Sequence, residues 1–242
     1  MSIRRYVGAV LPLFIALLAA SHAPADIIVQ YTFPTQTGAG VETGVGYNPT
    51  TVHPNLDLTF DMAVKDTAGT ITIEISNPTP NYSTQPVLRV DADGNTGGTT
   101  SLERLGNAVA NNKYFEFKIR IPTGYNLDLS SLDFVAARGG AGVPRGWGLK
   151  TSASGLAAGD AFVRWADITT VRATWTSVPV NLSGSAFQDL TGDVTFRFYV
   201  YSPGDGSTME FDNITLNGAL TPEPTTLALL GLGALGLLRR RG

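Results

Sequence analysis

Two stretches of the sequence alternate strictly between apolar and polar residues, and this alternation constrains the fold more than any other feature. In Tyr114–Ile121 the odd positions are Phe or Ile, and in Val194–Tyr201 the even positions are Val or Phe. A period of two is that of a β-strand with one buried and one wet face. Six side chains are therefore predicted to point into a core: Phe115, Phe117, Ile119, Phe196, Phe198 and Val200. Tyr199 and Tyr201 oppose the apolar face, so we expect them to be exposed.

The rest of the body, from Asp26 to Thr221, shows no helical period. It contains 22 Gly and 10 Pro, and no window of about 12 residues sustains an apolar repeat of 3.6, so any helix must be short. Many short strands with one wet face predict an all-β fold in which antiparallel sheet packs on sheet. Weaker strands are predicted over Ile27–Phe33, Leu56–Phe60, Thr70–Ile75, Val87–Asp91, Leu132–Ala136, Trp147–Thr151, Phe162–Trp165, Val171–Trp175 and Val178–Leu182.

Composition narrows the possible chemistry of this body. Its length suffices to bury a core without cross-links. The chain has no cysteine, which excludes disulfides, thiolate metal sites and cysteine nucleophiles. Between Asp26 and Thr221 there are 12 Lys and Arg against 19 Asp and Glu, a net charge of −7 without a basic run. We therefore expect no nucleic-acid partner.

The N-terminal segment has the three parts of a secretory signal peptide. Arg4 and Arg5 precede the 14 uncharged residues Val7–Ala20, and Ala23 and Ala25 place small residues at a cleavage site. An apolar stretch of this length is too short to span a bilayer as a helix, which needs about 20 residues. We therefore predict export and cleavage after Ala25.

No set of residues is singled out for catalysis. The glutamates that could form a glycosidase pair are Glu74, Glu103, Glu116 and Glu210. Of these, Glu116 and Glu210 fall on strands as ordinary solvent-facing positions, and no serine lies in a GxSxG motif. We expect no enzyme activity, with a secreted glycoside hydrolase as the least favoured alternative. Exposed aromatic side chains stack on sugar rings in β-sandwiches, and Tyr199 and Tyr201 are better candidates than the three tryptophans. A carbohydrate-binding module is therefore the main alternative function.

The end of the body carries a family resemblance. Val194–Tyr201, a Gly-rich turn and Met209–Gly218 together resemble the closing strands of the jelly-roll β-sandwich of exported bacterial proteins and carbohydrate-binding modules. The resemblance implies an antiparallel jelly-roll-like β-sandwich. It also implies that the final strand lies beside the region Ile27–Phe33.

The apolar pattern of this final strand changes parity beside Asp212. The apolar residues before it are Met209 and Phe211, and those after it are Ile214 and Leu216. Either a bulge lies near Asn213, or Asp212 points into the sandwich and must be paired, hydrogen-bonded or bound to a metal. The jelly-roll resemblance implies a structural Ca²⁺ at such an aspartate, whereas the residues favour a bulge or a backbone hydrogen bond. Apart from this ion, no cofactor is expected.

The C-terminal segment differs in composition from the body. Pro222, Glu223 and Pro224 are followed by Thr225–Leu238, which holds seven Leu, three Gly, two Ala and two Thr, and then by three arginines, Arg239, Arg240 and Arg241. This order of a Pro-Glu-Pro triplet, a short apolar helix and an arginine cluster is similar to the PEP-CTERM sorting signal. The resemblance implies recognition by an integral-membrane exosortase, cleavage near the triplet, and delivery to the envelope or an extracellular polysaccharide matrix.

The length of the apolar stretch, the charges and the prolines of this segment are consistent with a sorting signal. At 1.5 Å per residue the apolar stretch reaches about 21 Å, a marginal span of a bilayer core of about 30 Å. The arginines resist translocation and hold the C-terminus in the cytoplasm, which leaves the triplet at the outer surface. The prolines keep the triplet extended and outside the helix.

The sequence thus predicts a signal peptide (residues 1–25), a β-sandwich domain (26–220) and a sorting tail (221–242). We expect an exported protein that passes through an inner-membrane intermediate to the cell envelope or extracellular matrix, where its body is structural or adhesive. The expected partners are the secretion machinery, the exosortase, the membrane through the tail and, in the alternative function, an extracellular polysaccharide.

Overall fold

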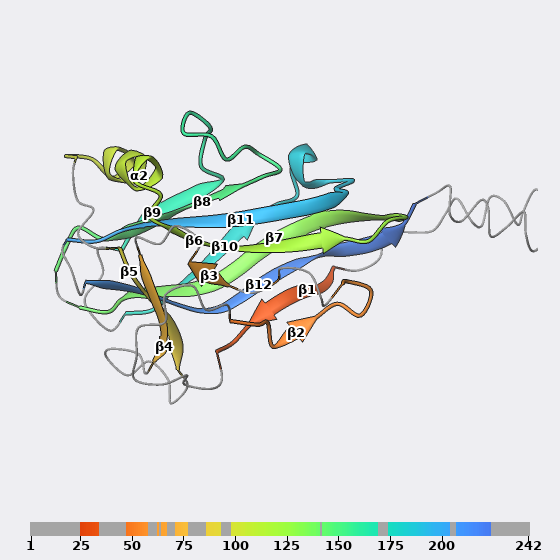
Figure 1. Cartoon of the computed structure of the whole chain (residues 1–242), viewed down its shortest axis with the longest axis horizontal. Helices are drawn as coiled ribbons and strands as arrows, with labels where there is room; N and C mark the ends of the chain where they lie inside the picture. The colour runs from red at the N-terminus through yellow and green to blue at the C-terminus, as the bar shows by residue number, and fades with distance from the viewer. Residues whose placement is uncertain are drawn as a thin grey trace, which may run out of the picture.

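The body is a sandwich of two antiparallel β-sheets (Figure 1). The structure, a computed structural model, describes residues 25–33, 47–57, 62, 64–66, 71–76, 86–92, 98–140, 142–168, 174–203 and 207–223. In these residues, one sheet has seven strands: β1 (Asp26–Tyr31), β2 (Thr51–Val52), β4 (Thr72–Ser76), β5 (Val87–Asp91), β7 (Tyr125–Arg138), β10 (Thr176–Asn181) and β12 (Thr208–Pro222). The other has five: β3 (Lys65–Asp66), β6 (Tyr114–Ile121), β8 (Gly146–Thr151), β9 (Arg164–Asp167) and β11 (Gly192–Tyr201). The predicted β-sandwich class is confirmed.

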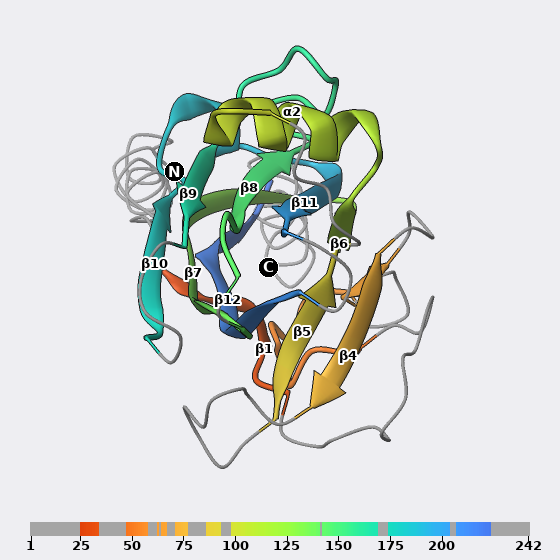
Figure 2. The same ribbon diagram turned by 90° about the vertical axis from the view of Figure 1, so that its left-hand side faces the viewer.

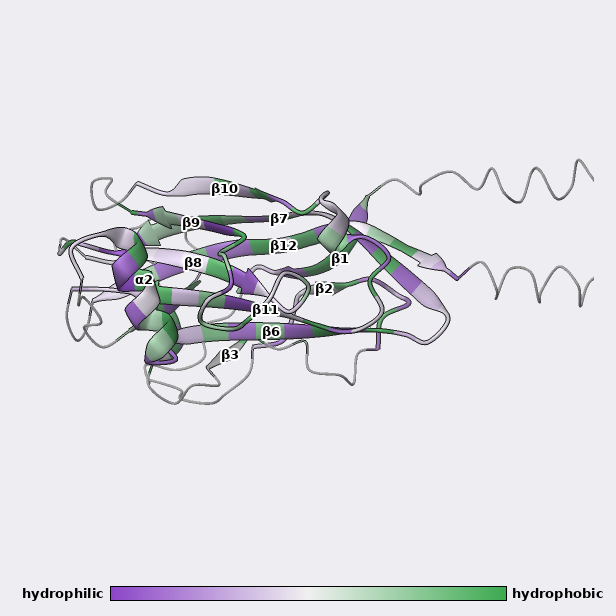
Figure 3. Cartoon of the chain, turned by 90° about the horizontal axis from the view of Figure 1, so that it is seen from above, coloured by the Kyte–Doolittle hydropathy of each residue, from purple (hydrophilic) through white to green (hydrophobic). Residues whose placement is uncertain are grey.

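The core lies between the sheets, and the side chains predicted to fill it are buried. All six, from Phe115 to Val200, have 0% exposure. Phe117 is opposite Phe196 and Phe115 is opposite Phe198 in the β6–β11 ladder, and each pair of rings stacks, with centroids 4.8 and 4.7 Å apart. Phe211 of β12 meets the edge of Phe115 from the other sheet. The alternation that predicts the strands is visible as hydrophobic and hydrophilic bands along them (Figure 3).

Strand β12 is central to the seven-stranded sheet and pairs with three strands. Its residues Thr208–Phe211 pair with β5, and Ile214–Gly218 pair with β1, which confirms that the final strand lies beside the first. β7 runs along its other edge up to Pro222. The partner therefore changes from β5 to β1 at Asp212 and Asn213, and the β4–β5 hairpin diverges from β1 there (Figure 2).

Two of the weaker strand predictions fail where the structure can test them. Leu56 and Asp57 belong to no strand, and Trp175 precedes β10 without joining it. Residues 58–60 and 171–173 lie outside the described residues.

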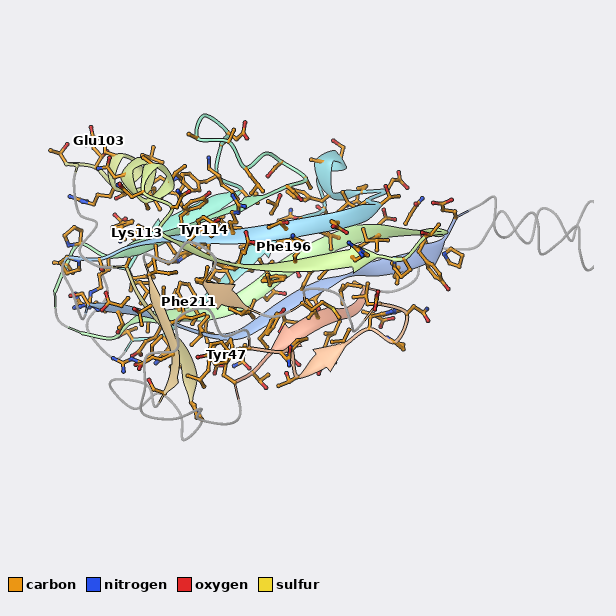
Figure 4. All side chains as sticks on the ribbon, viewed as in Figure 1. Tyr47, Glu103, Lys113, Tyr114, Phe196 and Phe211 are labelled. Carbon is orange, nitrogen blue, oxygen red and sulfur yellow. The ribbon has the colours of Figure 1, made fainter. Side chains whose placement is uncertain are left out.

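A helix covers part of the outer face of the five-stranded sheet, and it corrects one prediction. Helix α2 (Ser101–Ala110) packs Leu105 and Ala108 on the tyrosines of β11, so Tyr199 is 2% and Tyr201 0% exposed (Figure 2). The expected exposed tyrosine platform is therefore wrong. A capping box between Thr100 and Glu103 starts the helix, and this Thr-x-x-Glu pattern was a readable signal for it (Figure 4). A single-turn 3₁₀ helix, η1 (Ser185–Phe187), precedes β11.

Candidate functional site

The C-terminal end of β12 leads directly into the Pro-Glu-Pro triplet. Leu220 still packs against the core, Pro222 is the last strand residue, opposite Tyr125 of β7, and the amide of Glu223 donates a hydrogen bond of 2.8 Å to the carbonyl of Gly124. The strand thus continues two residues past the predicted domain end at residue 220. The first two residues of the triplet are held by the sheet.

The pairing explains how a proline is accommodated in this strand. Opposite residues of an antiparallel pair alternate between those that exchange hydrogen bonds and those that do not. Because Glu223 bonds to Gly124, the neighbouring Pro222 faces away from β7, where its missing N–H breaks no ladder bond. On that other edge β1 begins at Asp26, opposite Gly218, so among the described residues no strand pairs with 219–222 there. Prolines at open edges also discourage unwanted strand pairing.

The other predicted sorting residues are described only in part. Ala25 is exposed and immediately precedes β1. Ala23, Pro224 and the arginines Arg239, Arg240 and Arg241 lie outside the described residues, as do most of the signal peptide and the apolar tail. In the part of the chain that the structure covers, no helix has the length and apolar character to cross a membrane.

Residues 220–241 match the model of the PEP-CTERM protein-sorting motif. The chain carries this sorting motif. The match takes in the triplet, the apolar stretch and the arginine cluster, so the resemblance seen in the sequence is confirmed. The PEP-CTERM motif implies an exported protein that an exosortase processes.

Solved structures with a similar body come from several kinds of protein. The cleaved K3 adhesin domain of Lys-gingipain from Porphyromonas gingivalis is 13% identical, with 80% of this chain and 99% of that chain covered and a TM-score of 0.40. A xylan-binding domain from Paenibacillus barcinonensis is 8% identical (84% and 99% covered, TM-score 0.37), and a cyclase from Fischerella is 12% identical (82% and 98%, 0.41). No curated protein matches the chain.

Asp212 lies where the strand paired with β12 changes from β5 to β1, and it is almost fully buried, at 4% exposure. The register of the β12–β7 ladder shifts between Asp212 and Thr215, and Asn213 has φ +52°, so the predicted bulge is confirmed. The amide of Asn213 donates to Asp212 Oδ1 at 2.7 Å, which is the backbone hydrogen bond that the residues favoured. Burial raises the pKa of Asp212 to about 6, against the opposing effect of this hydrogen bond. Among the described residues no three side chains of His, Cys, Asp or Glu gather as a metal site.

The two glutamates expected to face solvent are buried instead. Glu116 is 7% exposed and accepts a 2.7 Å hydrogen bond from Arg197 Nε, and the Arg197 guanidinium lies 4.5 Å from the centre of the Tyr114 ring. Glu210 is fully buried, and its Oε1 lies 3.3 Å from Arg89 Nε. The same arginine pairs with Glu74 through Nη1, at 2.6 Å. The polar faces of these strands are therefore covered by ion pairs and neighbouring chain. Alternation alone could not reveal that cover.

A row of polar side chains crosses the outer face of the seven-stranded sheet, and sequence reasoning missed it. Gln30 of β1 donates to Thr215 of β12 at 3.0 Å, and Asn217 of β12 donates to Asp133 of β7 at 2.8 Å and to Ser131 at 3.0 Å. We call these five residues the polar row. All five are half-buried, and their cross-strand neighbours Pro179 and Thr51 are uncharged. They are far apart in sequence, so only strand pairing brings them together.

The tryptophans divide between the core and the surface. Trp147 is fully buried and meets Phe134 edge-on. Trp175 is half-buried, and Trp165, on the edge strand β9, is 41% exposed. Of the aromatic residues weighed for stacking on sugars, Trp165 has the most exposed ring.

Proposed function

We propose that the protein is an exosortase substrate at the cell surface or in the extracellular matrix, and that its sandwich has a structural or adhesive role. The observation that supports this is the direct continuity between a folded sandwich and the sorting motif. Cleavage near the triplet would release the sandwich whole, because β12 ends there. The proposed route passes through an inner-membrane intermediate in which the arginine cluster stays in the cytoplasm.

Replacing Glu223 tests the sorting step. We expect Glu223→Ala to insert in the membrane normally, since the apolar stretch and the arginines drive insertion, but to remain unprocessed in a host with the matching exosortase. Processing is measured by membrane fractionation followed by sizing of the protein. Removal of the tail should reduce the mass by about 2 kDa, at roughly 110 Da for each residue of this short membrane segment. Thr221→Ser, beside the triplet, is the matched control and should be processed. Normal processing of Glu223→Ala would contradict the proposal.

A second candidate function, binding of a polysaccharide, is supported by the polar row. Its amide, hydroxyl and carboxylate groups are held in place by hydrogen bonds across β1, β12 and β7, as preorganised recognition of hydroxyl-rich ligands requires. The neutral neighbours of Asp133 and Gln30 favour an uncharged glycan. A glycan array with residues 26–223 tests this, because Asp133→Ala should abolish binding. Asp193→Ala on the other sheet, whose carboxylate pairs with Arg120 at the surface, should not.

We also propose that the body is not a hydrolase. The glutamates weighed for that role are engaged elsewhere: Glu103 in the cap of α2, and Glu74, Glu116 and Glu210 with arginines. Release of reducing ends from an exopolysaccharide, lost in Glu116→Gln, would overturn this.

A further inference from the structure

The sorting triplet reaches the end of the sandwich with no linker between them. Leu220 and Tyr125 still contact the core, and Pro222 follows Leu220 by only two residues. The ladder partners are Thr221 with Asn126 and Pro222 with Tyr125, and the Glu223–Gly124 hydrogen bond closes it. An enzyme that reads the triplet therefore meets its first two residues, Pro222 and Glu223, as part of a folded sheet.

The turn that holds the triplet is itself well fixed. The amide of Tyr125 donates to Pro122 at 3.1 Å, and Gly124 adopts φ +84°, a left-handed conformation that glycine allows without strain. Ile121, just before this turn, is 3% exposed and is paired with Gly192 of β11. The carbonyl of Gly124 is thus anchored to both sheets. We call the segment Gly124–Asn126, paired with Thr221–Glu223, the junction clamp.

Opening the junction clamp needs little disruption of the rest of the molecule. Thr221 and Glu223 are half-buried and Pro222 is exposed, and the nearest buried residues of β12 towards the N-terminus are Gly218, which has no side chain, and Leu216. Separation of Thr221–Glu223 from β7 therefore costs a few backbone hydrogen bonds and almost no apolar burial. Proteolysis within folded segments generally proceeds through such local openings, and its rate follows the population of the open form.

We propose that the junction clamp gates sorting: the exosortase cuts only molecules in which Thr221–Glu223 has separated from β7. This rests on the proposed function, because it concerns regulation of the same processing step. The gate couples processing to the folded state of the body. The sandwich itself, through the Gly124 carbonyl and the Asn126 ladder position, positions the triplet and sets the rate of its release.

Two variants of the full-length precursor test the proposal: one opens the junction clamp and the other locks it. The first variant carries a Gly-Ser-Gly-Ser spacer between Thr221 and Pro222. The spacer separates the triplet from the sheet and leaves the distance between the triplet and the apolar stretch unchanged. Processing should become about tenfold faster, as the loss of one or two hydrogen bonds implies. The pair Asn126→Cys and Thr221→Cys locks the clamp, since opposite strand residues lie within disulfide reach. The chain has no other cysteine, so the pairing is unambiguous.

The assay follows the size shift over time in membranes that contain the exosortase. We expect the oxidised double-cysteine variant to be cut at least tenfold more slowly than the same protein after reduction, which is its matched control. Circular dichroism of each variant checks that the sandwich is folded. An unchanged or slower rate for the spacer variant, or equal rates for the oxidised and reduced forms, would overturn the gate. Failure of the wild-type chain to be cut at all would instead refute the proposed function.

Discussion

The buried carboxyl of Asp212 makes a quantitative prediction about stability. Its pKa is about 6 in the folded protein against an ordinary value of 3.8, because burial disfavours the charged form. The neutral carboxyl therefore stabilises the fold fully below about pH 3.8, and this contribution is lost as the pH rises through about 6. At about 1.36 kcal/mol per pKa unit, the free energy of unfolding should fall by about 3 kcal/mol over that interval.

Asp212→Asn removes the charge and keeps an oxygen that can accept from the Asn213 amide. We expect the variant to equal the wild type near pH 3.5 and to be more stable at pH 7 by up to about 3 kcal/mol, or about 6–12 °C in melting temperature for a domain of this size. Urea denaturation of residues 26–223 between pH 3.5 and 7 measures this. Asp193→Asn is the control. Because the hydrogen bond from Arg120 lowers the pKa of Asp193, the charged form of this carboxylate stabilises the fold, and the substitution should reduce stability at pH 7. A variant less stable than the wild type at pH 7 would refute the reasoning.

Two further predictions concern the core and the N-terminus. Phe198→Ala should cost about 3–5 kcal/mol, and Tyr199→Ala should be comparably costly because α2 buries that ring as well, so denaturation curves in which only Phe198→Ala is destabilised would contradict the assigned cover. N-terminal sequencing of the exported protein should begin at Asp26, since Ala23 and Ala25 flank the cleavage site; a chain beginning at Met1 or Ser2 would contradict it.

The comparison of sequence with structure separates what alternation can predict from what it cannot. It predicted β6 to the residue, because Phe115, Phe117 and Ile119 need a common buried face. It failed at Tyr199 and Tyr201, because a strand's pattern does not reveal that a distant helix covers its polar face. The Thr-x-x-Glu cap of α2 was present, but the helix is only 10 residues long, which is shorter than the window of about 12 residues over which a helical period was sought.

The candidate sites differ in the same way: those that are contiguous in sequence could be predicted, and those assembled from distant strands could not. The sorting motif could be predicted because it is contiguous in sequence and needs no tertiary contact. The change of parity beside Asp212 predicted either a bulge near Asn213 or an inward-pointing carboxylate, and the structure shows the bulge. The polar row could not be predicted, because Gln30 and Thr215 are 185 residues apart and the expected neighbourhood of the first and last strands did not give the register that brings them together. The junction clamp could not be predicted for the same reason, because Gly124 and Glu223 are distant in sequence and meet only through the pairing of β7 with β12.

The central place of β12 also determines when the protein can fold during export. β1 leaves the membrane first, yet its longer ladder is with β12, which emerges last. The seven-stranded sheet therefore lacks its middle strand until the residues next to the sorting motif have crossed, and contacts over such separations form slowly. On the export route proposed above, the seven-stranded sheet would therefore be completed only after Thr208–Pro222 had crossed the membrane. Arrest of translocation by the apolar tail and closure of the sandwich would then coincide at the same few residues.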